Sequence, residues 1–336
     1  MDYRYLGRSA LKVSPLCLGA MMFGNETDES TSKRIIDKAF DQGINFVDTA
    51  DVYHAGRSEE FVGRAISDRR DAWVVATKFG YPASATAGPN ESGQSRKWIM
   101  QSVDASLKRL GTDYIDLLYF HRALVDTPLE EALRAISDLI RQGKLRYYGV
   151  SNFHGWRIAE IVRVADSLGM ERPVASEPLY NLVTRVAEVE EIPAATQYGL
   201  GVVPYSPLAR GVLSGKYAVD KAPDPDSRVG RGDKRIQQTE WRPESLKVAQ
   251  TIAEHAASRG TTSIAFALAW VLNNRAISAA IAGPRTEAQW DSYIDALSVT
   301  LTSEDEHLVD SLVKPGHAST ANYTDPNYPV EGRIIR

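Results

Sequence analysis

Four side chains that can handle protons occur where short apolar runs of the sequence end. Asp48 ends one run, Lys78 ends a later one and His121 ends a third, while Tyr53 follows Asp48 by five positions. A phenol is a weak acid at neutral pH, because its unperturbed pKa is about 10. A nearby ammonium, itself held by a carboxylate, would stabilise the phenolate. We therefore predict that these four side chains form one cluster.

The elements that would position this cluster alternate regularly along the chain. Hydrophobic periodicity predicts helices separated by short apolar strands, about eight times in succession. The strands are expected at 16–19, 45–48, 73–78, 114–121, 145–150, 174–177, 200–205 and 276–281. The helices are expected at 32–42, 59–66, 98–110, 129–141, 156–168, 188–198, 244–258, 263–272 and 286–297. A small hairpin with its turn near residues 7–9 precedes them.

This alternation predicts an α/β fold, a (β/α)8 barrel, built as a single domain over residues 1–336. No GxGxxG follows the first strand, so a doubly wound dinucleotide-binding sheet is not indicated. Long loops at 80–95 and 208–241 follow strands and should lie on the face where barrel enzymes keep their active sites. Neighbouring strands are about 4.8 Å apart, which lets the cluster converge there. The tail, 315–336, is either disordered or folded over the barrel mouth.

Composition places limits on partners and location. The chain of 336 residues has a net charge of -4, which gives no reason to expect nucleic acid or an acidic membrane surface. Cys17 is the only cysteine, so an intrachain disulfide is excluded and a reducing compartment is favoured. There is neither a signal peptide nor an apolar run of about 20 residues. We expect a cytoplasmic protein, whose oligomeric state the sequence does not indicate.

Each residue of the cluster also has an ordinary structural role. A lysine at a strand end is often simply solvated, a histidine there is often hydrogen-bonded, and Asp48 could cap the following turn. A metal-dependent barrel hydrolase with Asp48 and His121 as ligands is an alternative. The sequence offers no His-x-His on the first strand and no second histidine at a strand end, so this ligand set is short and we expect no metal.

Taken together, the motifs resemble the aldo-keto reductase superfamily from about Tyr5 to Leu312. The matching segments are DTADVY at 48–53, ATK at 76–78, DLLYFHR at 116–122, GVSNF at 149–153, YSPLARGVLSGKY at 205–217 and AGPRT at 282–286. Proteins of this superfamily are barrels that reduce aldehydes and ketones with NAD(P)H. The resemblance implies an NADPH-dependent oxidoreductase that acts on a small-molecule carbonyl substrate.

The resemblance also assigns roles to the cluster. It implies that Tyr53 is the general acid that protonates the carbonyl oxygen and that Lys78 lowers the pKa of Tyr53. Asp48 would pair with Lys78, and His121 would orient the carbonyl and share the proton. These roles fit general acid catalysis, which works best when the pKa of the acid is brought toward ambient pH. The developing charge on the oxygen also needs preplaced donors.

Further positions correspond to the cofactor site of the superfamily. Ser151 and Asn152 resemble the pair that bonds the carboxamide, Tyr205 resembles the ring that stacks on the nicotinamide, and Arg285 resembles the contact to the 2′-phosphate. A guanidinium matches a phosphate with two hydrogen bonds, so NADPH is favoured over NADH. The other residues assigned to this site are Gly19, Met21, Met22, Ser206, Pro207, Leu208, Arg210, Gly211, Lys216, Gly283 and Gln289.

Two residues assigned to the cofactor site depart from the pattern. Glu177 stands where the superfamily usually has a glutamine that bonds the carboxamide. Its charge would favour the oxidised, cationic nicotinamide. Tyr293 stands where an asparagine commonly contacts the adenine, so that its ring could stack there or pack in the core.

The sequence gives one indication of the substrate class and leaves a regulatory role as an alternative to catalysis. Met21, Met22, Tyr53, Phe79, Tyr81 and Trp98 are expected near the pocket and suggest an apolar carbonyl compound. The alternative to catalysis is a regulatory role, because the potassium-channel β subunits of the superfamily act mainly as binding or sensing partners. The intact cluster is compatible with both.

Overall fold

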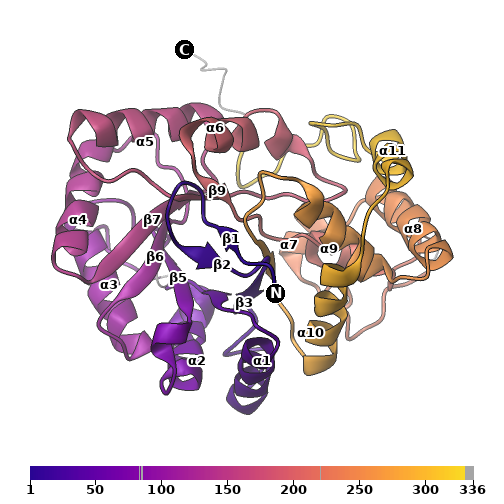
Figure 1. Ribbon diagram of the computed structural model, residues 1–336, viewed down its shortest axis with the longest axis horizontal. Helices are drawn as coiled ribbons and strands as arrows, with labels where there is room; N and C mark the ends of the chain where they lie inside the picture. The colour runs from indigo at the N-terminus through magenta and orange to yellow at the C-terminus, as the bar shows by residue number, and fades with distance from the viewer. Residues whose placement is uncertain (83, 85, 220, 330–336) are drawn as a thin grey trace. The chain divides into compact units, whose positions relative to one another are not determined.

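A computed structural model describes residues 1–82, 84, 86–219 and 221–329 (Figure 1). The chain divides into two compact units. The first unit comprises Met1–Pro178, Glu190–Tyr205 and Arg275–Asp291. The second comprises Leu179–Val189, Ser206–Asn274 and Ser292–Arg336.

The first unit contains eight parallel strands in the order expected of a (β/α)8 barrel, which confirms the predicted fold. They are β3 (Leu16–Gly19), β4 (Phe46–Asp48), β5 (Val74–Phe79), β6 (Ile115–Phe120), β7 (Leu145–Ser151), β8 (Ala175–Glu177), β9 (Gly201–Val202) and β10 (Ala280–Ala282). The pairing runs β10-β3-β4-β5-β6-β7-β8-β9. A parallel bridge between Val202 and Ile277 joins the two ends of this sheet. The backbone N–H of Ser278 also donates to the carbonyl of Val202 at 2.8 Å.

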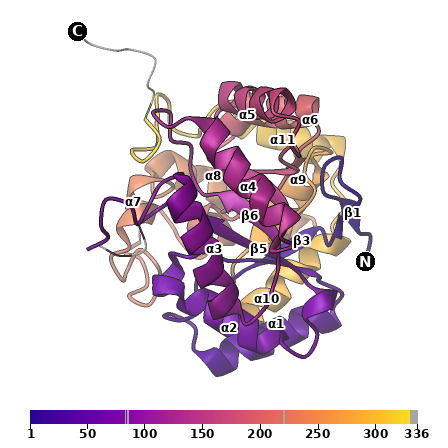
Figure 2. The same cartoon turned by 90° about the vertical axis from the view of Figure 1, so that its left-hand side faces the viewer.

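Six helices of the first unit lie outside the strands (Figures 1 and 2). They are α1 (Glu29–Asp41), α2 (Arg57–Ile66), α3 (Arg96–Leu110), α4 (Leu129–Arg141), α5 (Gly155–Ser167) and α6 (Glu191–Tyr198). In α4, Leu129, Leu133 and Ile136 recur at helical spacing and are all buried, so one face of the helix packs inward. Short 3-10 turns η1 (Tyr53–Gly56) and η2 (Arg70–Ala72) connect strands and helices.

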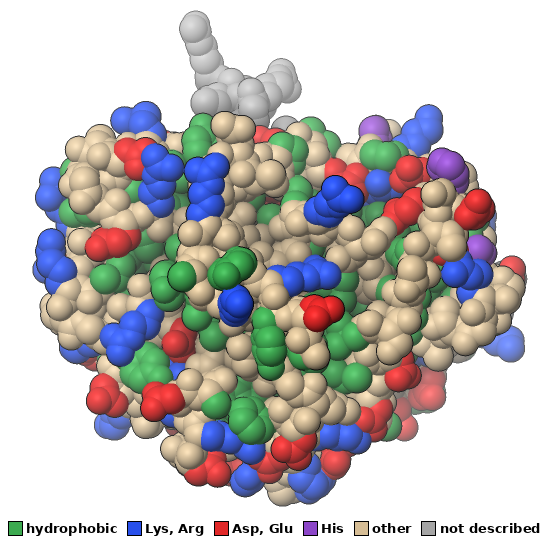
Figure 3. All heavy atoms as spheres, viewed as in Figure 1, with side chains coloured by type: hydrophobic (Ala, Val, Ile, Leu, Met, Phe, Trp, Pro, Cys, Tyr) green, Lys and Arg blue, Asp and Glu red, His purple; other side chains and the backbone are tan. Residues whose placement is uncertain are grey.

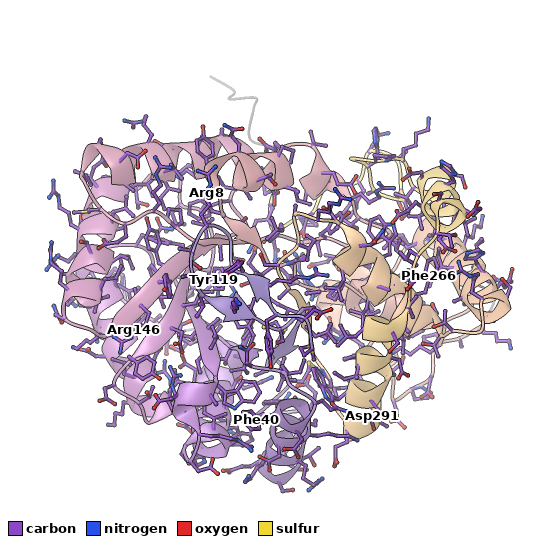
Figure 4. The ribbon with its side chains drawn as sticks, viewed as in Figure 1. Arg8, Phe40, Tyr119, Arg146, Phe266 and Asp291 are labelled. Atoms are coloured by element: carbon purple, nitrogen blue, oxygen red, sulfur yellow. The ribbon has the colours of Figure 1, made fainter. Side chains whose placement is uncertain are left out.

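The interior of the barrel is filled by side chains from alternate strand positions. Phe46, Ala76, Leu117 and Tyr119 belong to one buried cluster, and Tyr119 lies among the strands (Figure 4). A Cβ at Gly149 would approach a ring carbon of Tyr119 to 2.6 Å. The glycine therefore makes room for the large ring in a closely packed core.

The predicted N-terminal hairpin is present. Its strands β1 (Arg4–Tyr5) and β2 (Lys12–Val13) pair antiparallel. Gly7 occupies the turn with a φ of +59°, and a Cβ there would meet the carbonyl oxygen of Gly199 at 2.5 Å. Both the backbone conformation and the close approach thus require glycine at this position.

The second unit is helical. Its elements are η3 (Val186–Glu188), η4 (Ala209–Ser214), α7 (Lys234–Gln238), α8 (Pro243–Ser258), α9 (Ser263–Asn273), η5 (Asp295–Ser298) and α11 (Ser303–Leu312), and α10 (Glu287–Ile294) spans the boundary between the units. The sequence reading missed α7 and α11. A capping box was the available signal for α11, because the Thr302 side chain accepts from the Asp305 N–H while the Asp305 carboxylate accepts from the Thr302 N–H.

The described part of the predicted tail, up to residue 329, is attached within the second unit. The backbone of Ser319 donates to the carbonyl of Val183 at 2.9 Å. Asp325 accepts two hydrogen bonds from the guanidinium of Arg235, at 2.7 and 2.5 Å. Contacts with residues far away in the sequence therefore hold this stretch in place, and hydrophobic periodicity does not reveal such contacts. Residues 330–336 lie outside the described residues.

Lysine and arginine side chains are interspersed with aspartate and glutamate on the face seen in Figure 3. Such mixing agrees with the small net charge of -4. Across the described ranges, none of the helices has both the length and the apolar composition needed to cross a membrane.

Candidate functional site

The predicted cluster converges at the carboxyl ends of neighbouring strands in the first unit. Asp48 is the last residue of β4, Lys78 is the penultimate residue of β5, and His121 directly follows β6. Asp48 pairs with Ala76, two residues before Lys78, and Lys78 pairs with Tyr119, two residues before His121, so the three side chains come from adjacent strands at one end of the sheet. Lys78 is fully buried and Asp48 nearly so. The apolar strands thus carry polar side chains to one end of the barrel.

Lys78 is the centre of this cluster. Its ammonium forms an ion pair with Asp48 and donates to the carbonyl of Thr49 at 2.9 Å. The hydroxyl of Tyr53 lies 3.4 Å from the same nitrogen, and Oε1 of Glu177 lies 3.5 Å from it. The sequence placed Asp48 and Tyr53 beside Lys78, but it did not place Glu177 there.

The charge of Lys78 acts on Tyr53 in the expected direction, although the net pKa of the phenol moves the other way. Desolvation raises the pKa of Tyr53, the ammonium of Lys78 opposes that rise, and the carboxyls of Asp48 and Glu177 add to it. The predicted lowering of the Tyr53 pKa by Lys78 is therefore only one of several contributions to that pKa. In the protein without bound ligand Tyr53 keeps its proton, which is the form that an acid catalyst needs.

Lys78 itself stays charged. Burial lowers the pKa of Lys78, but Asp48 and Glu177, together with Tyr53, raise it further, and the net pKa is above the ordinary value. The ammonium consequently persists at neutral pH in spite of its burial. A permanent positive charge beside the phenol is available to stabilise a phenolate.

His121 faces Tyr53 with the edge of its ring. The two ring centroids are 6.0 Å apart, and the ring of Tyr81 lies 4.8 Å from His121 on another side. Burial, Lys78 and Arg122 all lower the pKa of His121, which is therefore neutral at physiological pH. Its Nδ1 atom is buried and has no hydrogen-bond partner among the described residues. A neutral imidazole can donate one hydrogen bond and accept another.

Asn152 connects three strand ends of the site. Its side-chain nitrogen donates to the backbone carbonyl of His121 at 3.0 Å and to Oγ of Ser151 at 3.0 Å. Its side-chain oxygen accepts from the hydroxyl of Tyr205 at 2.9 Å. Asn152 also has a φ of +58°, a conformation uncommon for residues other than glycine. The predicted residues Ser151, Asn152 and Tyr205 therefore form one hydrogen-bonded group.

The turn that carries Tyr53 is strained. His54 and Ala55 have φ values of 49° and 56°, and Gly56 follows at 89°. The imidazole of His54 contacts the carbonyl oxygen of Met21 at 2.8 Å, and a Cβ at Gly56 would come 2.5 Å from the side chain of Arg109. Consecutive left-handed residues persist only where their surroundings fix them, and they cluster at functional sites. The barrel therefore holds the phenol in place through this turn.

Sequence reasoning missed Asp51, which lies directly behind the tyrosine turn. Asp51 is 4% exposed, and both of its carboxyl oxygens lack a hydrogen-bond partner among the described residues. Burial and the neighbouring Glu59 raise its pKa to about 8, while Arg109 opposes the rise. The spacing of two aspartates around Thr49 and Ala50 was visible in the sequence, but burial was not.

Asp51 makes a testable contribution to stability. Between about pH 4 and pH 8 the folded protein holds a proton on Asp51 that the unfolded chain releases, so stability falls as the pH rises. We expect Asp51→Asn to remove this loss, raising the unfolding temperature relative to the parent more at pH 8.5 than at pH 5, as measured by calorimetry. An equal change at both pH values would contradict a protonated Asp51.

A second group of cofactor residues assigned to the first unit lies at the ends of β3 and β10 or shortly after them. A Cβ at Gly19 would meet the side chain of Ile281 at 2.8 Å and the Cα of Gly283 at 3.3 Å, so these strand ends approach closely. The backbone N–H of Arg285 donates to Oε1 of Gln289 at 2.8 Å. Arg285 itself makes no side-chain hydrogen bond or ion pair within the described ranges.

The two methionines after β3 differ. Met21 is 45% exposed, whereas Met22 is 4% exposed and packs in the core. Among the expected pocket residues, Phe79 packs against Phe120 with 4.9 Å between ring centroids, and Trp98 is buried. Tyr81 is the pocket residue that the structure places against His121.

The remaining cofactor residues belong to the second unit. Ser206, Arg210 and Gly211 all have positive φ values, of 55°, 53° and 98°. A Cβ at Gly211 would lie 3.1 Å from Nζ of Lys216, so this lysine folds back over the turn. Within the turn the backbone N–H groups of Ala209 and Gly211 donate to the carbonyls of Ser206 and Leu208, at 2.9 and 2.8 Å. Pro207 and Leu208 are buried in the same turn.

Arg210 and Tyr293, two further cofactor residues assigned to the second unit, are both held by their surroundings. Arg210 pairs with the buried Glu240 at 3.1 Å, so its charge is already compensated. Tyr293 is 8% exposed, which agrees with the core position that the sequence left open.

A cluster for metal binding is not seen. In the part of the chain that the structure describes, no group of three or more His, Cys, Asp or Glu side chains is arranged to hold an ion.

Comparisons with known proteins identify the family to which the chain belongs. A family model described as "Aldo/keto reductase family" matches residues 15–314. An uncharacterized oxidoreductase of Bacillus subtilis, YrpG, is 39% identical over an alignment of 314 residues that covers 90% of this chain and 93% of the relative. A versiconal hemiacetal acetate reductase of Aspergillus parasiticus is 32% identical, covering 94% of this chain and 99% of the relative. A probable voltage-gated potassium channel subunit beta of rice is 37% identical, covering 96% and 100%.

Proposed function

Because the chain belongs to the aldo/keto reductase family, we propose that it reduces an aldehyde or ketone to the alcohol, reversibly, with NADPH. The observation that carries this proposal is the contact of Lys78 with both Asp48 and Tyr53 at the carboxyl end of the barrel. A phenol that keeps its proton beside a buried ammonium is a suitable acid for a carbonyl oxygen.

Each residue of the cluster has a defined task in this proposal. Tyr53 donates its proton to the carbonyl oxygen, and Lys78 stabilises the phenolate that remains. Asp48 holds Lys78 in position, and the neutral His121 donates a hydrogen bond that orients the carbonyl. His121 is suited to this because burial and the charges of Lys78 and Arg122 lower its pKa, so the neutral imidazole has one N–H to donate.

The residues around the cluster fit a nicotinamide cofactor, which supplies the hydride when bound. Glu177 has a buried oxygen, Oε2, with no partner in the described part of the chain, as a residue that awaits a carboxamide would have. The hydroxyl of Tyr205 donates to the side-chain oxygen of Asn152 at 2.9 Å, which fixes the position of the ring. We propose that Ser151, Asn152, Glu177 and Tyr205 bind the nicotinamide and that the turn around Ser206 and Gly211 binds the pyrophosphate.

The guanidinium of Arg285 supports a preference for NADPH, because within the described residues it makes no hydrogen bond or ion pair that would have to be broken. We expect Arg285→Ala to weaken NADPH binding about 10- to 100-fold, the loss of one charge-assisted contact. NADH binding should remain unchanged, since NADH lacks the phosphate. Fluorescence titration with both cofactors measures this.

A matched control for this variant is Arg34→Ala. Arg34 is an exposed arginine of α1 that pairs with Glu287 at 2.7 Å. The Arg34→Ala variant should bind NADPH and NADH as tightly as the parent protein does. An equal loss of NADPH and NADH binding in Arg285→Ala would contradict a phosphate contact.

The substrate is proposed to be an apolar carbonyl compound, because Tyr81 borders His121 at 4.8 Å and offers an aromatic surface. The test of the function is NADPH oxidation by the purified protein with aldehydes, ketones and quinones of graded polarity, repeated with NADH. Turnover that favours small polar aldehydes over hydrophobic ketones would overturn this substrate class.

A regulatory role is the second candidate, favoured by the rice relative, whose name is that of a potassium channel β subunit. A protein that binds NADPH but reduces none of these carbonyl compounds would support that role over catalysis.

A further inference from the structure

Two carboxyl groups, those of Asp48 and Glu177, contact the ammonium of Lys78. Oε1 of Glu177 lies 3.5 Å from the nitrogen of Lys78, which also forms the ion pair with Asp48. The side chains of Asp48 and Glu177 are each 4% exposed and that of Lys78 is 0% exposed. Three ionisable groups thus share one buried space.

The charges in this space do not balance if both carboxyls are ionised. The other titratable groups that face Glu177 are Tyr53, Tyr119 and Cys17, which are all neutral when protonated. Lys78 is the one cation that acts on Glu177 in the described part of the chain. A buried unpaired charge is costly, so one of the two carboxyls should hold a proton.

The geometry assigns that proton to Glu177. Asp48 has the shorter contact to Lys78, whereas Glu177 stands farther away and leaves Oε2 buried without a partner among the described residues. Burial raises the pKa of Glu177 well above its ordinary value, Lys78 opposes the rise and Asp48 adds to it. A protonated carboxyl offers one donor and one acceptor, as a carboxamide partner requires.

We propose that Glu177 is protonated in the free protein and with reduced nicotinamide, and releases that proton to solvent when the oxidised, cationic nicotinamide binds. The inference rests on the proposed cofactor site. A positive ring beside Glu177 supplies the missing second cation and stabilises the carboxylate, and the neutral reduced ring does not. By linkage, affinity for NADP+ should rise with pH, by at most about tenfold per pH unit, relative to affinity for NADPH.

Titration calorimetry in two buffers of different ionisation enthalpy counts the protons released. From about pH 6 to about pH 8 we expect roughly one more proton released with NADP+ than with NADPH. Both cofactors carry the same 2′-phosphate, whose pKa is about 6, so its titration cancels in the comparison. In Glu177→Gln the difference should disappear, and the ratio of the two dissociation constants should no longer change with pH.

Each outcome decides between the two proposals. Failure of both cofactors to bind would remove the proposed function itself. Binding of both with equal proton release, or an excess release that persists in Glu177→Gln, would overturn the assignment to Glu177 alone. If the variant does not fold, the comparison of NADP+ with NADPH in the parent protein still decides whether a proton is released.

Discussion

Replacing Tyr53 by phenylalanine is expected to reduce carbonyl reduction by about 10²- to 10⁴-fold, the usual contribution of a general acid. In the proposed mechanism Tyr53 is the proton donor, and the variant lacks its hydroxyl. The hydroxyl contacts Lys78 at 3.4 Å, while the ring packs near His121, so phenylalanine keeps the packing and loses the proton. Steady-state turnover with NADPH and a reactive aldehyde measures the loss.

Cofactor binding separates loss of the acid from loss of the fold. Tyr53→Phe should bind NADPH nearly as the parent protein does, because the residues proposed to hold the nicotinamide are elsewhere. A control for the loss of a buried tyrosine hydroxyl is Tyr148→Phe in β7, whose hydroxyl donates to the carbonyl of Glu171 at 2.8 Å. Retained turnover in Tyr53→Phe would reassign the acid.

The barrel could be predicted because its strands and helices have different hydrophobic periods. β3 begins and ends as predicted, at Leu16 and Gly19, and α4 does too, at Leu129 and Arg141. The short β9 was predicted three residues longer at its carboxyl end than the observed strand. The backbone N–H groups of Val203 and Tyr205 still donate to the carbonyls of Ser176 and Pro178, at 2.8 and 3.0 Å. Periodicity therefore located the buried segment but not the residue at which the strand ends.

The cluster could be predicted because parallel strands bring their carboxyl ends together. Asp48 and Lys78 came from that rule. The contact of Glu177 with Lys78 could not be predicted from spacing, because it depends on how far the side chains reach across the barrel from β8 to β5. The burial of Asp51 was equally invisible. Both residues alter the electrostatics of the site, so the net pKa of Tyr53 also needed the structure.

Replacing Lys78 by methionine is expected to destabilise the fold by about 3–5 kcal/mol at neutral pH, the cost of removing one partner from a buried ion pair. Methionine fills a similar volume but leaves Asp48 and Glu177 without their ammonium. Carbonyl reduction should fall as well, because nothing then stabilises the phenolate of Tyr53. Urea unfolding at pH 7 measures the loss of stability.

The pH dependence of that loss identifies its cause. At about pH 5 the carboxyl of Asp48, whose pKa burial raises, accepts a proton more readily, so the penalty should be smaller than at pH 7. Lys33→Met is the matched control, since its pair with Asp37 at 2.7 Å is exposed and should contribute less than about 1 kcal/mol. A penalty for Lys78→Met that is equally small, or that does not change with pH, would mean that the ammonium does not compensate the buried carboxylate of Asp48.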